Sequence, residues 1–350
     1  MPQQAVIDES GVRELLGRAL QRTRVMAPVR RGRTAFDFQW VEDPAEVALT
    51  YSRTVLPPKK AFLPPREDLL EFRRSPEPTS RPLIEDDLFV LFGVHPCDLT
   101  AIGQLDWAMG RRHEVADPHY LARRRAATIA AVDCLPDEYC FCTSVGSCET
   151  REGADLFFTP VDGGYLVDVL TPKGEALIEG ASGLREPTRA ELAVAESFPD
   201  EKARRVTARI DAECNELPDL LDSGYDSEVW ERTAERCYSC GTCTDVCPTC
   251  FCFDVNDEVN LPLVTGTRLR EYDSCQFLDF ALVAGPHNFR PERVDRVRHR
   301  WFRKFVYLLR EHGMPFCVGC GRCSQACTAG ISLTDVINAV VAEAREGAAA

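Results

Sequence analysis

Two dense cysteine motifs near the C-terminal end constrain this chain more than any other feature. Each motif has four cysteines separated by two, two and three residues. The first motif contains Cys237, Cys240, Cys243 and Cys247, and the second contains Cys317, Cys320, Cys323 and Cys327. Seventeen cysteines in all, an odd number, and a chain of 350 residues argue against a disulfide scaffold. The spacing therefore predicts metal binding.

This spacing is typical of proteins that hold two [4Fe–4S] clusters side by side. The two-residue gaps let three thiolates surround one face of a cubane, and the three-residue gap turns the fourth sulfur toward the neighbouring cluster. We therefore expect the ligand sets to cross over between the motifs. Cluster one would use Cys237, Cys240, Cys243 and Cys327, and cluster two would use Cys317, Cys320, Cys323 and Cys247. A pair of zinc sites is the alternative, but zinc ribbons combine pairs of cysteines across a spacer.

Glycines inside both motifs fit this interpretation. Gly241, Gly319 and Gly321 would keep the backbone close to a cubane, where N–H groups can bond its sulfurs. Pro248 follows the first motif, whereas Thr328 follows the second. This difference bears on the local backbone shape and not on ligation.

A further group of cysteines lies in the N-terminal half of the chain. These residues follow two expected strands, whose ends would bring their loops together: Cys97, Cys134, Cys140, Cys142 and Cys148. Four of the five could hold a third iron–sulfur cluster. The alternative is that they are small buried side chains, as free cysteine often is.

Cys250 and Cys252 come directly after the first motif, and Cys275 follows further along. The preferred interpretation is that Cys250 and Cys252 shield cluster two. The other is that they join Cys275 at a further site.

Hydrophobic periodicity predicts an α+β protein with two domains. Residues 1–225 read as a mixed α/β domain with cysteine-rich loops, and residues 226–350 as an α-helical ferredoxin domain with two clusters. Apolar runs at 87–94 and 126–132 predict buried strands, and the pair 156–159 and 165–170 predicts a hairpin around Gly163. The proline-dense stretch 56–82 predicts an extended, irregular segment. Helices are expected at 12–25, 227–236, 301–311 and 333–345, and a helical connector at 187–221.

Basic side chains cluster between the two motifs of an otherwise acidic chain. They are Arg290, Arg293, Arg296, Arg298, Arg300, Arg303, Lys304 and Arg310. Two interpretations stay open: a solvated helix face, or a positive region that favours reduced clusters or binds an acidic partner. His287 lies just before this stretch and is expected to be a hydrogen-bonded loop residue.

Charge and missing motifs exclude several classes of protein. The net charge of −14 argues against a nucleic-acid partner. No apolar run is long enough for a membrane span, and no secretory leader is recognisable, so a cytoplasmic location is expected. Neither a Gly-x-Gly-x-x-Gly fingerprint after a strand nor a phosphate-binding P-loop is present. The chain is therefore expected to be a non-catalytic subunit that carries electrons.

Several short motifs, from about residue 50 to residue 345, resemble one known family. They lie at 57–60, 63–67, 92–99, 140–146, 247–252, 273–277 and 287–290. Together they resemble the β subunit of cytoplasmic nickel–iron hydrogenases (sulfhydrogenases) and the iron–sulfur electron-transfer subunit of anaerobic sulfite reductase, which belong to one group. Cys148 departs from the family's pattern, which would have glycine or proline there.

The resemblance implies a relay subunit. A flavin-containing, NAD(P)-binding subunit would supply electrons, and catalytic metal subunits would receive them. The expected function is electron transfer within a cytoplasmic nickel–iron hydrogenase. The alternatives are the same role in anaerobic sulfite reductase or a related reductase, and a redox-sensing iron–sulfur protein.

Overall fold

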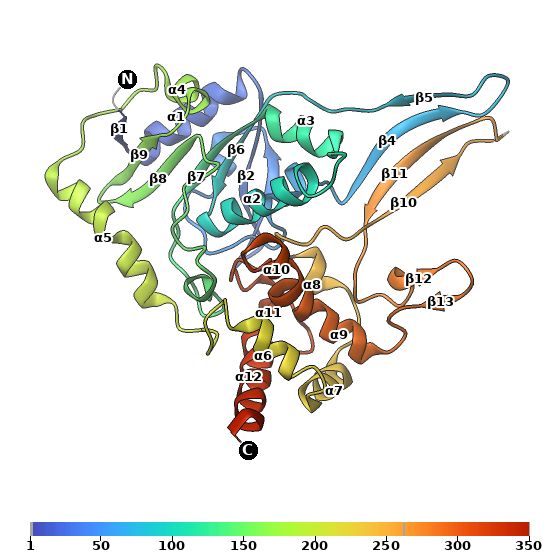
Figure 1. Cartoon of the computed structure of the whole chain (residues 1–350). Helices are drawn as coiled ribbons and strands as arrows, with labels where there is room; N and C mark the ends of the chain where they lie inside the picture. The colour runs from blue at the N-terminus through green and yellow to red at the C-terminus, as the bar shows by residue number, and fades with distance from the viewer. Residues whose placement is uncertain (1–2, 262, 350) are drawn as a thin grey trace. The chain divides into compact units, whose positions relative to one another are not determined.

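The computed structural model describes residues 3–261 and 263–349, and the chain forms two compact units (Figure 1). The first unit comprises residues 1–63, 85–138 and 146–206, and the second comprises 64–84, 139–145 and 207–350. In these units the last break along the chain lies at 206/207, and two short segments of the N-terminal half also belong to the second unit. One of these segments, residues 139–145, contains Cys140 and Cys142. The expected two-domain boundary at 225/226 stays a prediction.

A seven-stranded sheet forms the centre of the first unit. Its strand order is β1-β9-β8-β7-β6-β2-β3. The four adjacent strands β8, β7, β6 and β2 are parallel to one another, while β9, β1 and β3 are antiparallel to their neighbours. The strands are β1 (Gln4–Ile7), β2 (Arg24–Arg31), β3 (Ala35–Val41), β6 (Phe89–Val94), β7 (Ala127–Val132), β8 (Leu156–Val161) and β9 (Gly164–Val169).

Helices cover this sheet because its central strands are apolar on both faces. The helices of the unit are α1 (Glu9–Leu20), α2 (Pro96–Gly110), α3 (Pro118–Ala126), α4 (Pro172–Ile178) and α5 (Arg189–Arg205). Val90 and Phe92 pack in one core with Leu16 of α1 and Ile178 of α4. Phe89 points to the other face, since side chains alternate along a strand, and its ring contacts Phe62. Every residue of β6 is buried.

A buried ion pair fixes the ends of the loop that contains most of the N-terminal cysteines. Lys202 of α5 donates to the carboxylate of Asp133 and to the backbone carbonyl of Cys148. Lys202 is 1% exposed and Asp133 is 7% exposed. The Lys202 side chain thus joins Asp133 and Cys148, which lie just before and just after the segment that belongs to the second unit.

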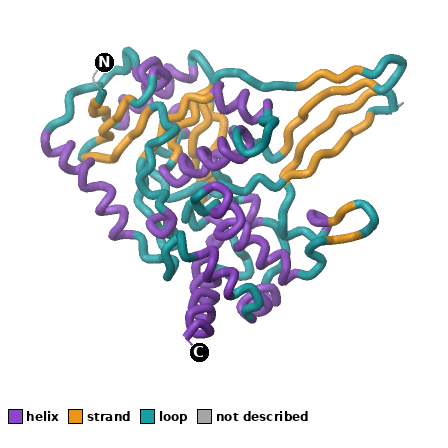
Figure 2. The backbone as a smooth tube through the Cα atoms, viewed as in Figure 1, coloured by secondary structure: helices purple, strands orange, loops and turns teal. Residues whose placement is uncertain are grey.

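The second unit combines a small antiparallel sheet with a group of helices (Figure 2). The sheet has the order β10-β11-β4-β5. Its strands are β4 (Arg66–Arg73), β5 (Thr79–Pro82), β10 (Phe253–Val259) and β11 (Thr265–Tyr272), and a separate pair is β12 (Leu282–Val283) and β13 (His287–Asn288). The helices are α6 (Leu217–Ser223), α7 (Glu228–Arg236), α8 (Thr242–Asp245), α9 (Arg293–Phe302), α10 (Leu308–His312), α11 (Arg322–Gln325) and α12 (Leu333–Ala349), with a π-helical turn at Arg303–Tyr307 between α9 and α10.

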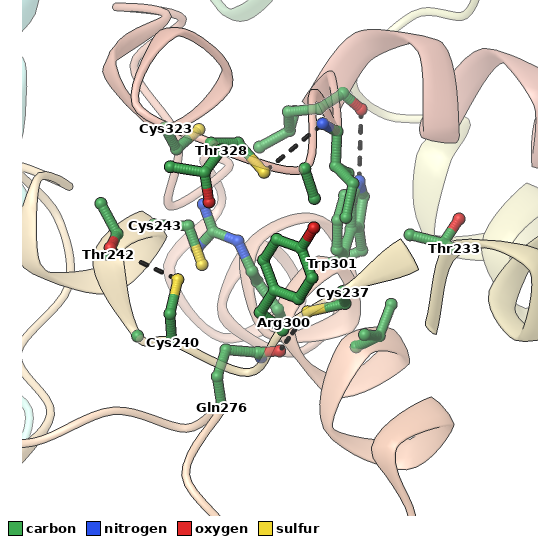
Figure 3. Close-up of a pocket in the computed structure, with 17 residues that line it drawn as sticks. Thr233, Cys237, Cys240, Thr242, Cys243, Gln276, Arg300, Trp301, Cys323 and Thr328 are labelled. Carbon is green, nitrogen blue, oxygen red and sulfur yellow. Dashed lines mark hydrogen bonds between the residues drawn. The ribbon is translucent and has the colours of Figure 1, made fainter. Parts of the chain in front are cut away.

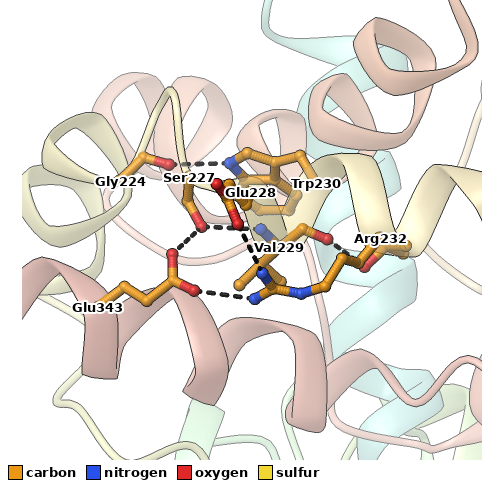
Figure 4. Close-up of polar contacts among 8 residues, drawn as sticks. Gly224, Ser227, Glu228, Val229, Trp230, Arg232 and Glu343 are labelled. Carbon is orange, nitrogen blue, oxygen red and sulfur yellow. Dashed lines mark hydrogen bonds and ion pairs between the residues drawn. The ribbon is translucent and has the colours of Figure 1, made fainter.

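Helices α7 and α12 are joined at the surface by a small polar network (Figure 4). The hydroxyl of Ser227 caps α7 by accepting from the Val229 amide at 3.1 Å. The same hydroxyl donates to Glu343 of α12, which also accepts from Arg232 at 2.9 Å. These contacts fix the helix that leads directly into Cys237 against the C-terminal helix.

The main elements agree with the sequence expectations, with three corrections. The strands at 87–94 and 126–132, the hairpin and the helices flanking the motifs are present. The stretch 56–82 is not irregular throughout, since it contains β4 and β5. The insert between the motifs contains β10 and β11, which the helical ferredoxin expectation left out. The connector at 187–221 is also interrupted, because residues 206–216 between α5 and α6 are not helical.

In the described residues, no helix is both long and apolar enough for a bilayer crossing.

Candidate metal centre

The two cysteine motifs have the same local backbone. Gly241 and Gly321 adopt left-handed conformations, with φ of +77° and +70°, and each begins a one-turn helix that carries the third cysteine. Ser239 and Gly319 occupy equivalent positions and have φ of +56° and +60°. Pro248 and Thr328, which follow the fourth cysteines, both lie in turns. The second motif therefore forms the same turn with threonine that the first motif forms with proline.

Glycine is required at 319 and 321 because another segment packs against them. A Cβ atom on Gly319 would lie 2.5 Å from the backbone nitrogen of Cys142. One on Gly321 would lie 2.4 Å from the carbonyl oxygen of Tyr139. The Phe141 amide donates to the Gly319 carbonyl at 2.8 Å. Segment 139–145 therefore covers the second motif, a role that the sequence did not indicate.

One cavity contains the first three cysteines of the first motif together with the last cysteine of the second (Figure 3). Its empty volume, including space open to solvent, is about 580 Å³. The cysteines that line it are Cys237, Cys240, Cys243, Cys323 and Cys327. Four of these are the ligands expected for cluster one, and Cys323 is expected to bind cluster two. The cavity is thus lined by cysteines from both motifs.

Hydrogen-bond donors approach several of these sulfurs. The Ser239 amide donates to Cys237 Sγ and the Ile331 amide donates to Cys327 Sγ, each over 3.4 Å. Desolvation raises the pKa of the Cys243 thiol to about 12. Without a metal this thiol stays protonated at neutral pH, so metal binding would release its proton.

The fourth cysteine of the first motif contacts a buried cation. Lys304 Nζ lies 3.2 Å from Cys247 Sγ and also donates to Thr249 Oγ1 and to the Phe316 carbonyl. A hydrogen bond with Cys250 and the charges of Lys304 and Arg300 lower the pKa of Cys247. Burial alone would lower the pKa of Lys304, but the charge of the neighbouring Cys247 thiolate outweighs it and raises that pKa.

The second motif approaches the same lysine. Phe316, whose carbonyl accepts from Lys304, directly precedes Cys317. Burial raises the pKa of Cys317, and Lys304 opposes that effect. Both Cys247 and Cys317 are buried, at 7% and 8% exposure. Lys304 therefore links the end of the first motif to the start of the second.

The basic stretch between the motifs divides into an inward and an outward part. Arg296, Arg300 and Lys304 repeat every four residues on one helical face and are all buried. Arg310 points outward and pairs with Asp219 and Asp222. A solvated helix face does not describe the three buried cations. The four-residue spacing in the sequence was the signal that could have indicated their burial. The interpretation that the positive region favours reduced clusters or binds an acidic partner stays a prediction.

The Arg300 side chain indicates that this cavity suits an anionic group. It is 4% exposed, and neither of its terminal nitrogens has a hydrogen-bond partner among the described residues. None of the described residues that line the cavity in Figure 3 is acidic. A buried, unpaired cation is costly to keep. An iron–sulfur cluster with thiolate ligands is anionic, so the donor set and the cation both fit such a group.

The N-terminal cysteines are divided between the two units. Cys97, Cys134 and Cys148 belong to the first unit, and Cys140 and Cys142 to the second. Within residues 3–261 and 263–349, no three His, Cys, Asp or Glu side chains surround a point suited to a single metal ion. A third cluster held by these five cysteines stays a prediction. His287 lies on the exposed β13, where its ring contacts Phe289.

Comparison with known proteins agrees with this centre. A family of 4Fe–4S dicluster domains matches residues 236–331, which contain both motifs. The chain is therefore an iron–sulfur protein with a 4Fe–4S dicluster domain. The β subunit of sulfhydrogenase 2 from Pyrococcus furiosus is 39% identical over 335 residues, which cover 95% of this chain and 96% of that protein. The chain belongs to the family of sulfhydrogenase β subunits, as the sequence motifs indicated. No solved structure matches it.

Proposed function

We propose that this chain is the electron-transfer subunit of a cytoplasmic nickel–iron hydrogenase. A flavin-containing, NAD(P)-binding subunit would supply it with electrons, which it would deliver to the catalytic metal subunits. The observation that carries the proposal is the cavity shared by Cys237, Cys240, Cys243 and Cys327, because it combines cysteines of both motifs. Family membership supports the same role.

The proposed ligands follow from the two motifs. Cys237, Cys240, Cys243 and Cys327 would hold one [4Fe–4S] cluster. Cys317, Cys320, Cys323 and Cys247 would hold the other. Bound there, each cluster would supply a centre that accepts and gives up one electron.

The chain's own residues prepare these sites. Amides at 239 and 331 donate to ligand sulfurs, and such bonds adjust the electronic properties of a metal site. Lys304 places a positive charge beside Cys247. Segment 139–145 packs on the second motif and limits the access of water to it.

The test is purification of the native complex under anaerobic conditions. Nickel, flavin and iron should co-purify with this chain, and its clusters should be reduced by NADH or NADPH and reoxidised by the hydrogenase subunits. Cys243→Ala should abolish this transfer, whereas Cys214→Ser, which lies outside both motifs, should preserve it. Siroheme in place of nickel would instead assign the chain to a sulfite reductase. Clusters that are never reoxidised during turnover would contradict electron transfer.

A further inference from the structure

A second cavity lies beside the dicluster centre and contains three cysteines outside the motifs. Cys250, Cys252 and Cys275 line it together with Arg300, and its empty volume is about 270 Å³. Cys250 and Cys275 are buried, at 7% and 3% exposure, and Cys252 is half-buried. Two separate parts of the chain therefore bring their thiols to one cavity, whose volume includes space open to solvent.

Basic side chains dominate the same cavity. Arg300, Arg303 and Lys304 line it, and none of its described lining residues is acidic. Arg303 stacks on the ring of Phe251, 4.5 Å from its centroid, and this contact keeps its charge close to Cys252. Lys304 already contacts Cys247, so three neutral thiols would offer no anion to Arg300 and Arg303 within this cavity.

Arg300, which also faces the cavity of cluster one, is the side chain that points to an anionic ligand here. Its two terminal nitrogens are buried and have no hydrogen-bond partner among the described residues, and the side chain lines both this cavity and that of cluster one. Simple shielding of cluster two by Cys250 and Cys252 would require thiols but no cation here. A disulfide between two of the thiols would be neutral and would supply no anion within this cavity.

We propose that Cys250, Cys252 and Cys275 hold a further iron–sulfur cluster in this cavity, with Arg300 as its counter-cation. Thiolates bound to iron give the negative charge that the cavity requires. The proposal is for a polynuclear cluster, whose irons each take one of these thiolates, and not for a single ion. It does not depend on the proposed electron-transfer partners.

Iron content tests the proposal in the full-length chain, reconstituted anaerobically with ferrous iron and sulfide. Two cubanes account for about eight iron atoms per chain, so the unmodified chain should contain three to four more. The double variant Cys252→Ser/Cys275→Ser should return to about eight and lose one component of the electron paramagnetic resonance spectrum. The matched control, Cys214→Ser, should keep the full content. About eight iron atoms in the unmodified chain, or no decrease in the double variant, would overturn the proposal.

A second variant keeps the test decisive if the double variant does not fold. Cys134→Ser/Cys148→Ser removes two of the N-terminal cysteines and leaves this cavity intact. The additional iron should persist in that variant. If the iron content fell to about eight there, the extra cluster would belong to the N-terminal cysteines and the present assignment would be wrong. Neither result affects the two-cubane function, which needs only the eight motif cysteines.

Discussion

The ammonium group of Lys304 donates to the sulfur of Cys247 across 3.2 Å, in the interior of the second unit. The lysine is 4% exposed, and its other two hydrogen bonds go to Thr249 and to the backbone of Phe316. All three donors of the ammonium are therefore used. It joins the end of one motif to the start of the next and places one positive charge beside a proposed cluster ligand.

Replacing this charge should change a cluster's potential without removing the cluster. In Lys304→Met, the midpoint potential of the cluster bound by Cys247 should fall by on the order of 100 mV, because a unit charge about 5 Å away contributes roughly 3 kcal/mol at an effective dielectric constant of about 20. Redox titration followed by electron paramagnetic resonance measures the shift.

The control for this charge is Lys304→Arg, which keeps it. The potential of Lys304→Arg should stay close to that of the unmodified chain, and the iron content should be the same in all three proteins. Equal shifts in both variants would show that packing, and not charge, determines the potential.

The glycines of the second motif should be far less tolerant of substitution than Gly313, a left-handed glycine in open space. Gly313 has φ of +81°, and a Cβ added there would meet nothing within 4 Å, so Gly313→Ala should cost only about 1–2 kcal/mol of unfolding free energy. Gly319→Ala meets the same backbone penalty and also collides with the backbone of Cys142. Denaturant unfolding should show that Gly319→Ala loses roughly 1–3 kcal/mol more unfolding free energy than Gly313→Ala, the cost of overpacking a core.

Proteolysis provides a second measurement for the same pair of variants. If the collision displaces segment 139–145, protease should cleave that segment faster in Gly319→Ala than in Gly313→Ala. Equal stability and equal cleavage in the two variants would mean that the segment does not pack on the motif.

The buried pair of Lys202 and Asp133 should matter far more than an exposed pair on the same helix. Lys202→Met leaves Asp133 as an uncompensated buried charge and should cost about 3–5 kcal/mol. Arg205→Met, which breaks the exposed Arg205–Glu201 pair, should cost less than about 0.5 kcal/mol. Chemical denaturation monitored by circular dichroism gives both values. A small effect of Lys202→Met would indicate that water already reaches Asp133.

The sequence predicted those parts of the fold that depend on local pattern. Strands β6 and β7 are continuous apolar runs, and the hairpin has a glycine turn, so both were recognisable. The sheet β10-β11-β4-β5 was missed because it pairs strands nearly 200 residues apart in the chain. All residues of β10 are exposed, and the brief alternation of Phe253, Val255 and Val259 with polar residues was not recognised as a strand.

For the candidate site, too, the sequence predicted the features that depend on local spacing and missed those that depend on packing. Cysteine spacing alone indicated which thiols would share a cluster, because a cubane fixes the distances between its ligands. The roles of Arg300, Lys304 and segment 139–145 depend on which side chains face inward after packing. Gly319 and Gly321 were expected to approach a cubane closely, which stays a prediction, whereas the structure shows the backbone of residues 139–142 as their close neighbour.

His299 should make the stability of the second unit depend on pH. Burial and the charges of Arg290 and Arg303 lower its pKa from the ordinary 6.5 to about 4, and its ring contacts that of Tyr307. The folded protein therefore keeps the imidazole neutral, while the unfolded chain protonates it below pH 6.5. The contribution of the neutral His299 to the unfolding free energy is fully present above pH 6.5 and is lost as the pH falls through about 4. Between pH 7 and pH 5 the loss should be roughly 1–2 kcal/mol, allowing for partial exposure.

The matched variant for this effect is His299→Gln, which cannot gain a proton. Unfolding free energies of the two proteins should be compared at each pH on samples with equal iron content, since acid also releases metal. The unfolding free energy of the unmodified chain, relative to that of His299→Gln, should fall by roughly 1–2 kcal/mol between pH 7 and pH 5. The difference between the two proteins should level off below pH 4. Parallel curves over the whole range would show that His299 is protonated equally in the folded and unfolded states, and so is not desolvated in solution.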